Sequence, residues 1–487
     1  MKKRFQVEFH FRNALIFDGD GAEPFKGDIG ISDGKIDFVA PASESIEVIS
    51  DKEYDLAGMA LAPGFIDAHT HDDHAVLDPV KIYPKLSQGV TTIVAGNCGI
   101  SLPPLTLNGQ MPPPPLNLLG NSGLFKFPTM ASYRKSLAKN GHAVNLVYLI
   151  GHSSLRIKVM NDVNREANSE EIRLMHNLLT QALNEGASGF STGLFYPPNK
   201  AASEKEVVGV ASAMKKHGGI YTTHMRDEGD DVIKSIDESL STAKKAGVPL
   251  LISHHKCTGR QNWGRTRETL QLLEEHRPSL PLNFDIYPYT AGSTILQEDQ
   301  VSEETRIMVT WSKTHPERTG QELGDIAREW EVSCKEAARR LKPAGAIYFQ
   351  MHEEDVQRLL KSNIAIIGSD GIPEDEHPHP RLWGTFPRII GHYARELGLL
   401  TMSEAINKMT GLPAKVFGLG KRGRIAPDHF ADLVIFDPKT IIDKADYDNP
   451  KVPSEGINAV WVNGKEVLNS GSIGVSDAGR LLQSDFS

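Results

Sequence analysis

The sequence predicts an α/β protein that combines a (β/α)8 TIM-like barrel with a small β-sandwich domain formed by both chain termini. Three observations support this fold class. Eight short apolar runs alternate with helical patterns in the middle of the chain, strand patterns occupy both ends, and 487 residues are too many for one small core. A barrel of roughly 250 residues or more, with additions, accounts for this length.

Both ends of the chain carry hairpin patterns. Asp33-Gly34 lies between two apolar stretches near the N-terminus, and Asn463-Gly464 lies between two more near the C-terminus. Asp-Gly and Asn-Gly pairs favour the tight turns that join antiparallel strands. We therefore expect residues 1–60 and 420–487 to form one small β domain.

The middle of the chain, residues 61–419, has the alternating pattern of a parallel barrel. Helical patterns separate several of the apolar runs, including 170–184, 203–216 and 231–246. Because the strands of such a barrel run in one direction, we expect the ends of the apolar runs to meet at one face. These runs end near Asp67, Asn97, His152, Thr192, His224, His254, Tyr287 and Asp370.

Two segments interrupt this alternation. The proline-rich segment 103–128 follows the second predicted strand, and a longer segment spans about 292–349. Each is either a tolerated surface insertion or a lid over the mouth of the barrel. The sequence leaves the first segment open between these two interpretations. For the second we favour a lid that moves when substrate binds.

Composition and charge exclude several classes of protein. The formal net charge of −9 provides no positive footprint for nucleic acid or for an anionic membrane. Three cysteines do not make a disulfide framework in a chain of this length, and no stretch approaches the ~20 apolar residues of a membrane span. We expect a soluble, cytoplasmic protein that acts on a small molecule, and the oligomeric state stays open.

A pair of histidines ends the first apolar run. His69 and His71 are two residues apart, which places both side chains on one face of a strand. Two imidazoles on one face make half of a metal site. Alone this pair is a weak indication, because a surface pair or two core histidines would be as common.

Four further metal-capable residues strengthen the indication. Cys98, His224, His254 and Asp370 each follow a separate apolar run. Barrel enzymes place their chemistry at the C-terminal ends of the strands, so convergence of five strand ends favours a metal site over chance. Imidazole, thiolate and carboxylate groups suit zinc, with nickel or cobalt as substitutes. The alternative for Cys98 is an inert buried thiol, against which the surrounding glycines argue.

Longer motifs around these residues resemble a known family. The sequence is similar to the N-acyl-D-amino-acid deacylases, the D-aminoacylase branch of the amidohydrolase superfamily, over nearly the whole chain. That family has a barrel and a small β domain from both termini, which agrees with the pattern described above. The motifs that carry the resemblance are Gly89-Val90-Thr91-Thr92 with Cys98, Thr222–Gly229, Ser253–Cys257, Asp285–Tyr289, Gly368–Gly371 and His377–Thr385.

The resemblance implies one tight zinc and a weaker second metal position. Many relatives in the superfamily bridge two metals with a modified lysine on the fourth strand, where this sequence has Phe190-Ser191-Thr192-Gly193. The implied ligands are Cys98, His224 and His254 for the tight zinc and His69, His71 and Asp370 for the second position, with Cys98 able to bridge.

The resemblance also implies a catalytic base and a substrate pocket. Asp370 would take a proton from water and return it to the leaving nitrogen. We expect Asp227 and Glu228 to be helix-terminal or structural carboxylates. The implied substrate contacts are Lys256, Tyr287 and Arg381 for the α-carboxylate, with Arg381 in a loop after the last strand, and Phe195, Tyr348 and Met351 for the side chain. From the residues alone, each contact has an ordinary structural alternative.

Together these interpretations predict zinc-dependent hydrolysis of the amide bond of N-acyl-D-amino acids, giving a carboxylate and a free D-amino acid. One alternative is a cyclic-amide hydrolase of the hydantoinase or dihydroorotase type, and the missing lysine counts against it. Another is a barrel that binds without catalysis, and the complete ligand set counts against that. The apolar pocket favours neutral side chains, but the preferred side chain, the acyl group and the number of metals stay open.

Overall fold

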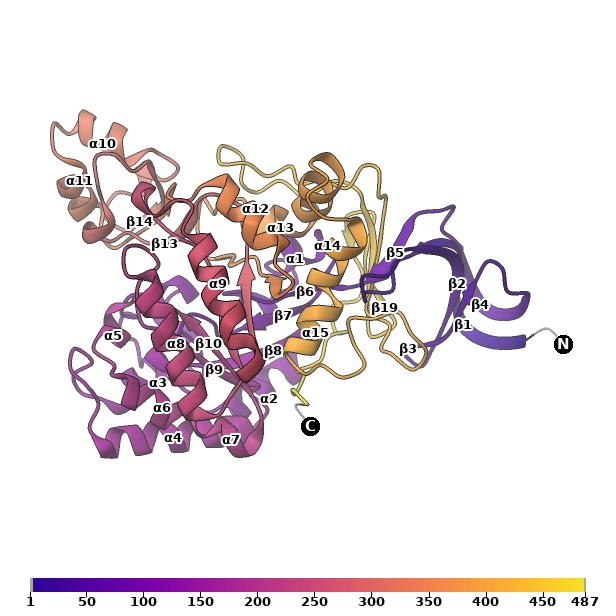
Figure 1. The fold of residues 1–487 in the computed structure, drawn as a ribbon, viewed down its shortest axis with the longest axis horizontal. Helices are drawn as coiled ribbons and strands as arrows, with labels where there is room; N and C mark the ends of the chain where they lie inside the picture. The colour runs from indigo at the N-terminus through magenta and orange to yellow at the C-terminus, as the bar shows by residue number, and fades with distance from the viewer. Residues whose placement is uncertain (1–2, 486–487) are drawn as a thin grey trace.

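The centre of the protein is a closed sheet of parallel strands. The computed structural model describes residues 3–485 (Figure 1). The backbone N–H of Ala68 donates to the carbonyl of Ile367 at 3.1 Å, and this bond joins the first strand to the last. The eight strands, which pair in sequence order around the sheet, are β6 (Phe65–Asp67), β7 (Val90–Ala95), β8 (Asn145–Gly151), β9 (Gly189–Gly193), β10 (Ile220–His224), β11 (Leu250–Ile252), β12 (Leu282–Ile286) and β16 (Ala365–Ile367). The predicted barrel is therefore confirmed.

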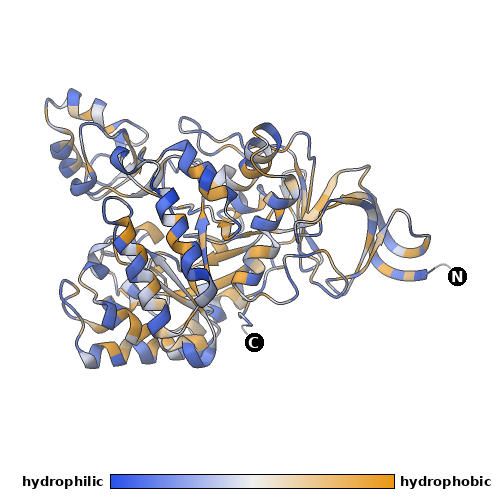
Figure 2. Cartoon of the chain, viewed as in Figure 1, coloured by the Kyte–Doolittle hydropathy of each residue, from blue (hydrophilic) through white to orange (hydrophobic). Residues whose placement is uncertain are grey.

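Helices connect the barrel strands and cover them from outside. In Figure 2 the barrel strands are mostly apolar, whereas the surrounding helices mix apolar and polar faces. This is the pattern expected when each helix buries one stripe against the sheet. The helices outside the insertion are α1 (Tyr83–Leu86), α2 (Met130–Asn140), α3 (His152–Val159), α4 (Ser169–Asn184), α5 (Pro197–Lys200), α6 (Glu204–Ala211), α7 (Met214–His217), α8 (Val232–Ala246), α9 (Thr266–His276), α12 (Glu353–Lys361), α13 (Arg381–Arg388), α14 (Met402–Met409) and α15 (Gly411–Val416).

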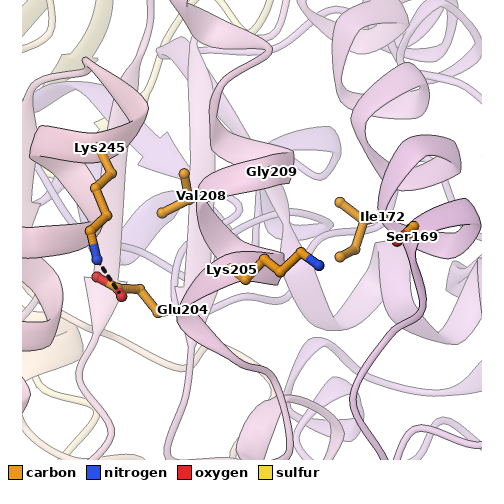
Figure 3. A pocket seen from close by; sticks show the side chains of 7 residues that line it. All are labelled: Ser169, Ile172, Glu204, Lys205, Val208, Gly209 and Lys245. Atoms are coloured by element: carbon orange, nitrogen blue, oxygen red, sulfur yellow. Dashed lines mark hydrogen bonds and ion pairs between the residues drawn. The ribbon is translucent and has the colours of Figure 1, made fainter.

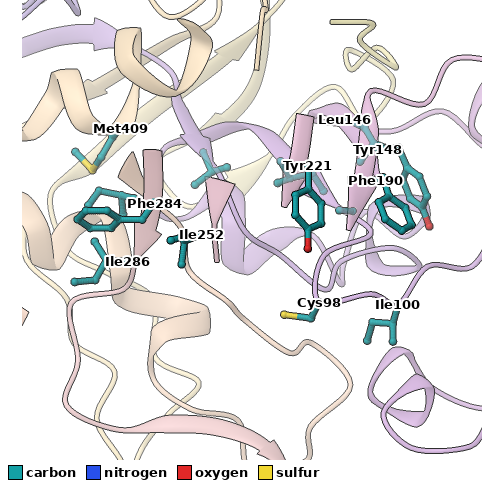
Figure 4. Packing of buried hydrophobic residues seen from close by; sticks show 14 of the residues in the cluster. Cys98, Ile100, Leu146, Tyr148, Phe190, Tyr221, Ile252, Phe284, Ile286 and Met409 are labelled. Carbon is teal, nitrogen blue, oxygen red and sulfur yellow. The ribbon is translucent and has the colours of Figure 1, made fainter. Parts of the chain in front are cut away.

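One large apolar cluster fills the space between strands and helices. Figure 4 shows Phe190, Tyr221, Ile252 and Phe284 within it, each from a different barrel strand, with Cys98 near its edge. Buried side chains of this size make a core stiff, because close packing leaves few voids. The strand ends are therefore held at fixed positions, which is what a metal centre needs.

Strands from both termini form a second, separate sheet. Antiparallel pairing of β5 with β17 joins its two parts, and Phe11 packs edge-on against Trp461 with ring centroids 5.2 Å apart. This mixed nine-stranded sheet contains β1 (Lys3–Ile16), β2 (Phe25–Ser32), β3 (Lys35–Pro41), β4 (Ile46–Asp55), β5 (Ala60–Pro63), β17 (Leu433–Phe436), β18 (Ile457–Val462), β19 (Lys465–Asn469) and β20 (Ser472–Ile473). The predicted β domain from both termini is confirmed. Its limits stay a prediction, and residues 1–2 and 486–487 lie outside the described chain.

The segment predicted as a lid is a small unit with its own core. Its three strands are β13 (Gly292–Ile295), β14 (Ile307–Ser312) and β15 (Ala344–Tyr348), and its helices are α10 (Leu323–Glu329) and α11 (Cys334–Leu341). Figure 1 places it at the opposite end of the long axis from the terminal sheet. Movement of this unit stays a prediction.

The proline-rich segment is packed into the protein. Leu116, Leu118 and Leu119 form a short turn of 3-10 helix and are all buried in the main cluster. Such burial excludes a loose surface loop. Within residues 3–485, no helix combines the length and the hydrophobicity that a membrane crossing requires.

Candidate metal centre

The six predicted ligand residues lie at or just after the C-terminal ends of barrel strands. His69 and His71 follow β6, Cys98 follows β7, His254 follows β11 and Asp370 follows β16. His224 is the last residue of β10. All six side chains are buried. The parallel direction of the strands therefore brings them to one face of the barrel, as the sequence predicted.

Three of these residues have a strained backbone. Cys98, His254 and Asp370 have φ angles of 53°, 36° and 50°, in the left-handed region that non-glycine residues rarely adopt. Each such residue costs about 1–3 kcal/mol, and this cost is typical of functional sites. At Gly96, two residues before Cys98, a Cβ atom would lie 2.0 Å from the carbonyl oxygen of Leu149. The close backbone approach expected around Cys98 is thus present.

One group of potential ligands contains Cys98, His224 and His254. The Sγ of Cys98 lies 3.3 Å from Nε2 of His254 and 3.8 Å from Nδ1 of His224. The three donor atoms lie within 4.8 Å of one another. We call these residues the first group. One sulfur and two nitrogens at this separation suit a zinc ion.

A second group contains His69, His71 and Asp370 and shares Cys98 with the first. Nε2 of His69 lies 3.2 Å from the Cys98 Sγ and 3.4 Å from Oδ1 of Asp370. Nε2 of His71 lies 3.2 Å from the same carboxylate oxygen. Cys98 therefore occupies the position expected of a bridging ligand. That each residue binds metal stays a prediction.

The charge states of the two acidic members favour metal binding. Burial raises the pKa of the Cys98 thiol, but the imidazoles of His69 and His254 outweigh it and hold that pKa well below its usual value. Burial also raises the pKa of Asp370, but the Arg381 guanidinium and the neighbouring imidazoles together outweigh it, so this pKa too is well below normal. A thiolate and a carboxylate are the forms that bind a cation.

Two carboxylates that the sequence interpretation missed lie behind the ligands. Oδ2 of Asp285 is 3.2 Å from Nδ1 of His69, and Oε1 of Glu228 is 3.0 Å from Nδ1 of His254. The other Glu228 oxygen is 3.8 Å from Nε2 of His224. Metal-binding histidines usually donate their outer N–H to such a carboxylate. Glu228 is therefore part of the site and more than the structural carboxylate we expected.

One sequence feature points to Asp285. It lies within the strand Leu282–Ile286, and a carboxylate among buried apolar residues is rare unless it is paired. Glu228 precedes helix α8, where a carboxylate is ordinary. Only the folded structure shows that it contacts two histidines.

A cavity of about 550 Å³ adjoins both groups. The metal-capable residues His71, His224, His254 and Asp370 line it. So do all the predicted substrate contacts, which are Lys256, Tyr287, Arg381, Phe195, Tyr348 and Met351. The structure therefore brings the predicted pocket and the predicted metal ligands together in one space.

Two cations flank Tyr287. The Arg381 guanidinium lies 4.5 Å from the centre of the Tyr287 ring, and Nζ of Lys256 lies 5.8 Å from it. Each cation also faces a carboxylate: Nη1 of Arg381 is 3.0 Å from Asp370 and Nζ of Lys256 is 2.7 Å from Glu228. Arg381 begins helix α13, so its expected place in a loop was wrong. The helix fixes its backbone more firmly than a loop would.

Several donors in this cluster have no hydrogen-bond acceptor within the described chain. They are Nε and Nη1 of Arg381 and the hydroxyl of Tyr287, all buried. Although Nη1 forms an ion pair with Asp370, its geometry is not that of a hydrogen bond. Because an unfilled buried donor is costly, and Arg381 and Tyr287 both line the cavity, these three donors are candidates for binding a ligand. Two guanidinium donors and a hydroxyl suit a carboxylate.

The three predicted side-chain contacts form an apolar wall. The ring of Phe195 stacks on His224 with centroids 5.3 Å apart, and Met351 packs beside Tyr287. The Tyr348 hydroxyl is occupied, since it donates to the carbonyl of Ile295 at 3.1 Å. Tyr348 therefore presents its ring to the cavity.

A separate groove of about 460 Å³ lies between helices α4, α6 and α8 (Figure 3). Glu204 and Lys245 form an ion pair of 2.6 Å across it. None of its lining residues lines the cavity at the metal centre. Its ion pair is already satisfied, so we assign it no chemistry.

Comparison with known proteins places the chain in a family. The profile of the amidohydrolase family matches residues 52–279 and 325–468. A D-aminoacylase from Alcaligenes xylosoxydans xylosoxydans is 45% identical over 96% of both chains. The chain belongs to the D-aminoacylase branch of the amidohydrolases. From the same organism, an N-acyl-D-aspartate deacylase and an N-acyl-D-glutamate deacylase are each 42% identical to this amidohydrolase, covering 98% and 99% of it and 95% and 98% of their own lengths.

Solved structures of related amidohydrolases agree with the fold. A D-aminoacylase with a binuclear metal centre, described by one-metal activation and second-metal attenuation, superposes with a TM-score of 0.95 at 45% identity, covering 98% of this chain and all of that one. The N-acyl-D-glutamate deacylase of Bordetella bronchiseptica, bound to zinc and a phosphonate inhibitor, has a TM-score of 0.93 at 39% identity with the same coverage. Both the barrel and the terminal sheet of this amidohydrolase are thus shared.

Proposed function

We propose that this protein hydrolyses the amide bond of N-acyl-D-amino acids and releases a carboxylate and a free D-amino acid. The observation that carries the proposal is one cavity in which two ligand groups sharing Cys98 adjoin the unfilled donors of Arg381 and Tyr287. A metal centre acts on the amide, and the donors bind the free α-carboxylate. The names of the relatives support the same activity.

The residues fit zinc. In our proposal Cys98, His224 and His254 hold one tight ion, and His69, His71 and Asp370 provide a weaker second position with Cys98 shared. The mixed sulfur, nitrogen and oxygen donors and the outer carboxylates support this assignment. Bound zinc polarises an amide carbonyl and lowers the pKa of a water molecule.

Asp370 moves the proton in this proposal. Its Oδ1 faces the two histidines of the second group and its Oδ2 faces Arg381, so the carboxylate lies between the ligand cluster and the cavity. It accepts a proton from the attacking water and returns the proton to the leaving nitrogen. The ion pair with Arg381 keeps the carboxylate oriented while it does so.

The α-carboxylate fixes the substrate. Arg381 supplies positive charge and a buried guanidinium N–H without an acceptor in the described chain, and the Tyr287 hydroxyl supplies a further donor. Lys256 adds a second positive charge near the Tyr287 ring. With the amide at the metal centre and the carboxylate at these donors, only one configuration at the α-carbon directs the side chain towards Phe195, Tyr348 and Met351. The relatives support the D configuration.

A direct assay tests the proposal. We expect hydrolysis of N-acetyl-D-methionine, little hydrolysis of the L isomer, and zinc in the purified protein by elemental analysis. Simple hydantoins lack the free carboxylate and should be poor substrates. Turnover of hydantoin with none of N-acetyl-D-amino acids would instead support the cyclic-amide alternative, and zinc without turnover of either would support a binding protein.

Two broader expectations accompany this proposal. We propose a cytoplasmic location, which is supported by three free, buried cysteines. We also keep residues 1–60 with 420–487 and residues 61–419 as the limits of the two domains, with the insertion at about 292–349. Limited proteolysis followed by mass spectrometry tests these limits.

A further inference from the structure

The cavity has a second apolar wall that the proposed function does not use. Leu118 and Ile372 line the cavity, and each side chain is only 4% exposed. Leu118 comes from the proline-rich segment after β7, and Ile372 follows Asp370 by two residues in the loop after β16. Two loops that are distant in sequence thus contribute aliphatic side chains to one space.

This wall lies beside the second group of ligands. The backbone N–H of His71 donates to the carbonyl of Gly371 at 3.3 Å, which ties the Ile372 loop to that histidine. A Cβ atom on Gly120 would lie 3.7 Å from the side chain of Glu374, so the proline-rich segment and the Ile372 loop are in contact. The wall of Phe195, by contrast, lies against His224 of the first group.

The parts of an N-acyl-amino acid divide between these two walls. Its amide must reach the metal centre and its α-carboxylate the donors of Arg381 and Tyr287. Met351 packs directly beside Tyr287, so its wall adjoins the carboxylate donors and suits the side chain on the same carbon. The acyl group lies on the other side of the scissile bond. Leu118 and Ile372 provide an apolar surface for it beside the second group of ligands. Tyr196 and Phe349 also line the cavity, but their rings contact His224 and Tyr447.

We propose that Leu118 and Ile372 form a subsite for an apolar N-acyl group longer than acetyl. This inference rests on the proposed function and names the acyl half of the substrate. The cavity volume of about 550 Å³ lies within the range that holds drug-sized ligands, which leaves space beyond an acetyl group. Chains such as butanoyl and hexanoyl bury methylene groups against the two side chains.

The subsite also disfavours a charged acyl group. Two carboxylates, Asp370 and Glu374, lie near the wall, and the cations Arg381 and Lys81 already pair with them at 3.0 Å and 2.6 Å. A succinyl carboxylate placed there would be desolvated beside other negative charges, which is costly. N-butanoyl substrates should therefore exceed N-succinyl substrates, although the two acyl chains have the same number of carbons.

A series of acyl chains on D-methionine tests the subsite. We expect kcat/KM of the wild-type protein to rise from N-acetyl to N-hexanoyl. Leu118→Trp fills the space and should lower the ratio of hexanoyl to acetyl kcat/KM by roughly 10–200-fold, the range for small size differences in apolar pockets. Leu118→Asn keeps the shape of leucine but is polar, so it should lower the same ratio by several-fold. If the Leu118→Trp variant does not fold, the Leu118→Asn variant tests the subsite in its place.

A neighbouring leucine is the matched control. Leu119 is buried in the same turn but does not line the cavity, so Leu119→Ala should keep the wild-type ratio whatever it does to stability. If N-acetyl-D-methionine is hydrolysed but neither Leu118 variant changes the ratio, the subsite is wrong and the proposed function stands. If the wild-type protein hydrolyses no N-acyl-D-amino acid, with D-methionine, D-aspartate and D-glutamate all tested, both are wrong.

Discussion

The two ligand groups differ in where their carboxylate lies. In the first group, Cys98, His224 and His254 are the potential ligands, and Glu228 faces the outer nitrogens of both histidines. In the second group the carboxylate of Asp370 is itself among the potential ligands. Both carboxylates line the cavity, so they differ in their contacts with the ligands and not in their access to substrate. A carboxylate behind the ligands orients them, whereas one among the ligands lies where a proton can be moved.

This difference suggests a division of labour between the two groups. We expect the first group to hold the metal, because Glu228 faces both of its histidines, whereas in the second group Asp285 faces only His69. We expect the second group to supply the base. The cations repeat the division, since Lys256 pairs with Glu228 and Arg381 pairs with Asp370, and both cations lie near the ring of Tyr287. Four substitutions test this comparison, in order of decreasing expected effect.

Cys98→Ala removes the ligand that both groups share. We expect loss of bound zinc and a fall in activity of more than about 10⁴-fold, beyond the usual contribution of a general base alone. Elemental analysis and steady-state kinetics measure the two effects. Cys257→Ala is the matched control, because Cys257 is equally buried but belongs to neither group. Full activity of metal-free Cys98→Ala protein would end the assignment of the centre.

Asp370→Asn separates zinc binding from proton transfer. We expect the protein to keep about one zinc, because the first group is intact, and to lose about 10²–10⁴-fold in kcat, because an amide cannot accept the proton. Zinc content and kcat are measured on the same preparation. Loss of all zinc would show that zinc binding also depends on the second group. A wild-type kcat would show that Asp370 is not the base.

Arg381→Ala tests the carboxylate donors. Removing one partner of a buried charge pair costs on the order of 2–5 kcal/mol, so kcat/KM for N-acetyl-D-amino acids should fall by roughly thirtyfold to several thousandfold. The corresponding amides should lose less, since only the orientation of Asp370 is then affected. Arg388→Ala is the control, because Arg388 lies on the same helix but pairs with Asp443. Equal losses on acid and amide would contradict carboxylate binding.

Glu228→Gln tests the orientation of the first group. The zinc affinity should fall by about 10–100-fold, the usual effect of losing an outer carboxylate, and excess zinc should restore most of the activity. A competition titration with a chelator measures the affinity. Asp227→Asn provides the comparison, since within the described residues the Asp227 carboxylate accepts hydrogen bonds only from the backbone N–H groups of Gly229 and Asp231 and contacts no histidine. An unchanged zinc affinity would show that Glu228 does not orient the histidines and only pairs with Lys256.

The sequence by itself determined the barrel and its ligand face. Short apolar runs mark buried parallel strands, and the residue after each run lies at the carboxyl end of its strand. His69, Cys98, His254 and Asp370 were therefore located by local patterns alone. The resemblance to a family added the substrate contacts, all of which line the cavity.

Only the tertiary structure decided which groups surround those residues. Glu228 contacts His254, Asp285 contacts His69, and Leu118 and Ile372 line the same cavity. The physical reason is that these contacts join segments far apart in the chain, and hydrophobic periodicity reports only the environment of each segment. Local patterns likewise did not show that Arg381 begins a helix and that its Nε and Nη1 have no hydrogen-bond acceptor in the described chain. The sequence specified at which strand ends the metal-capable residues lie. Long-range packing specified how the charged side chains of the site are paired.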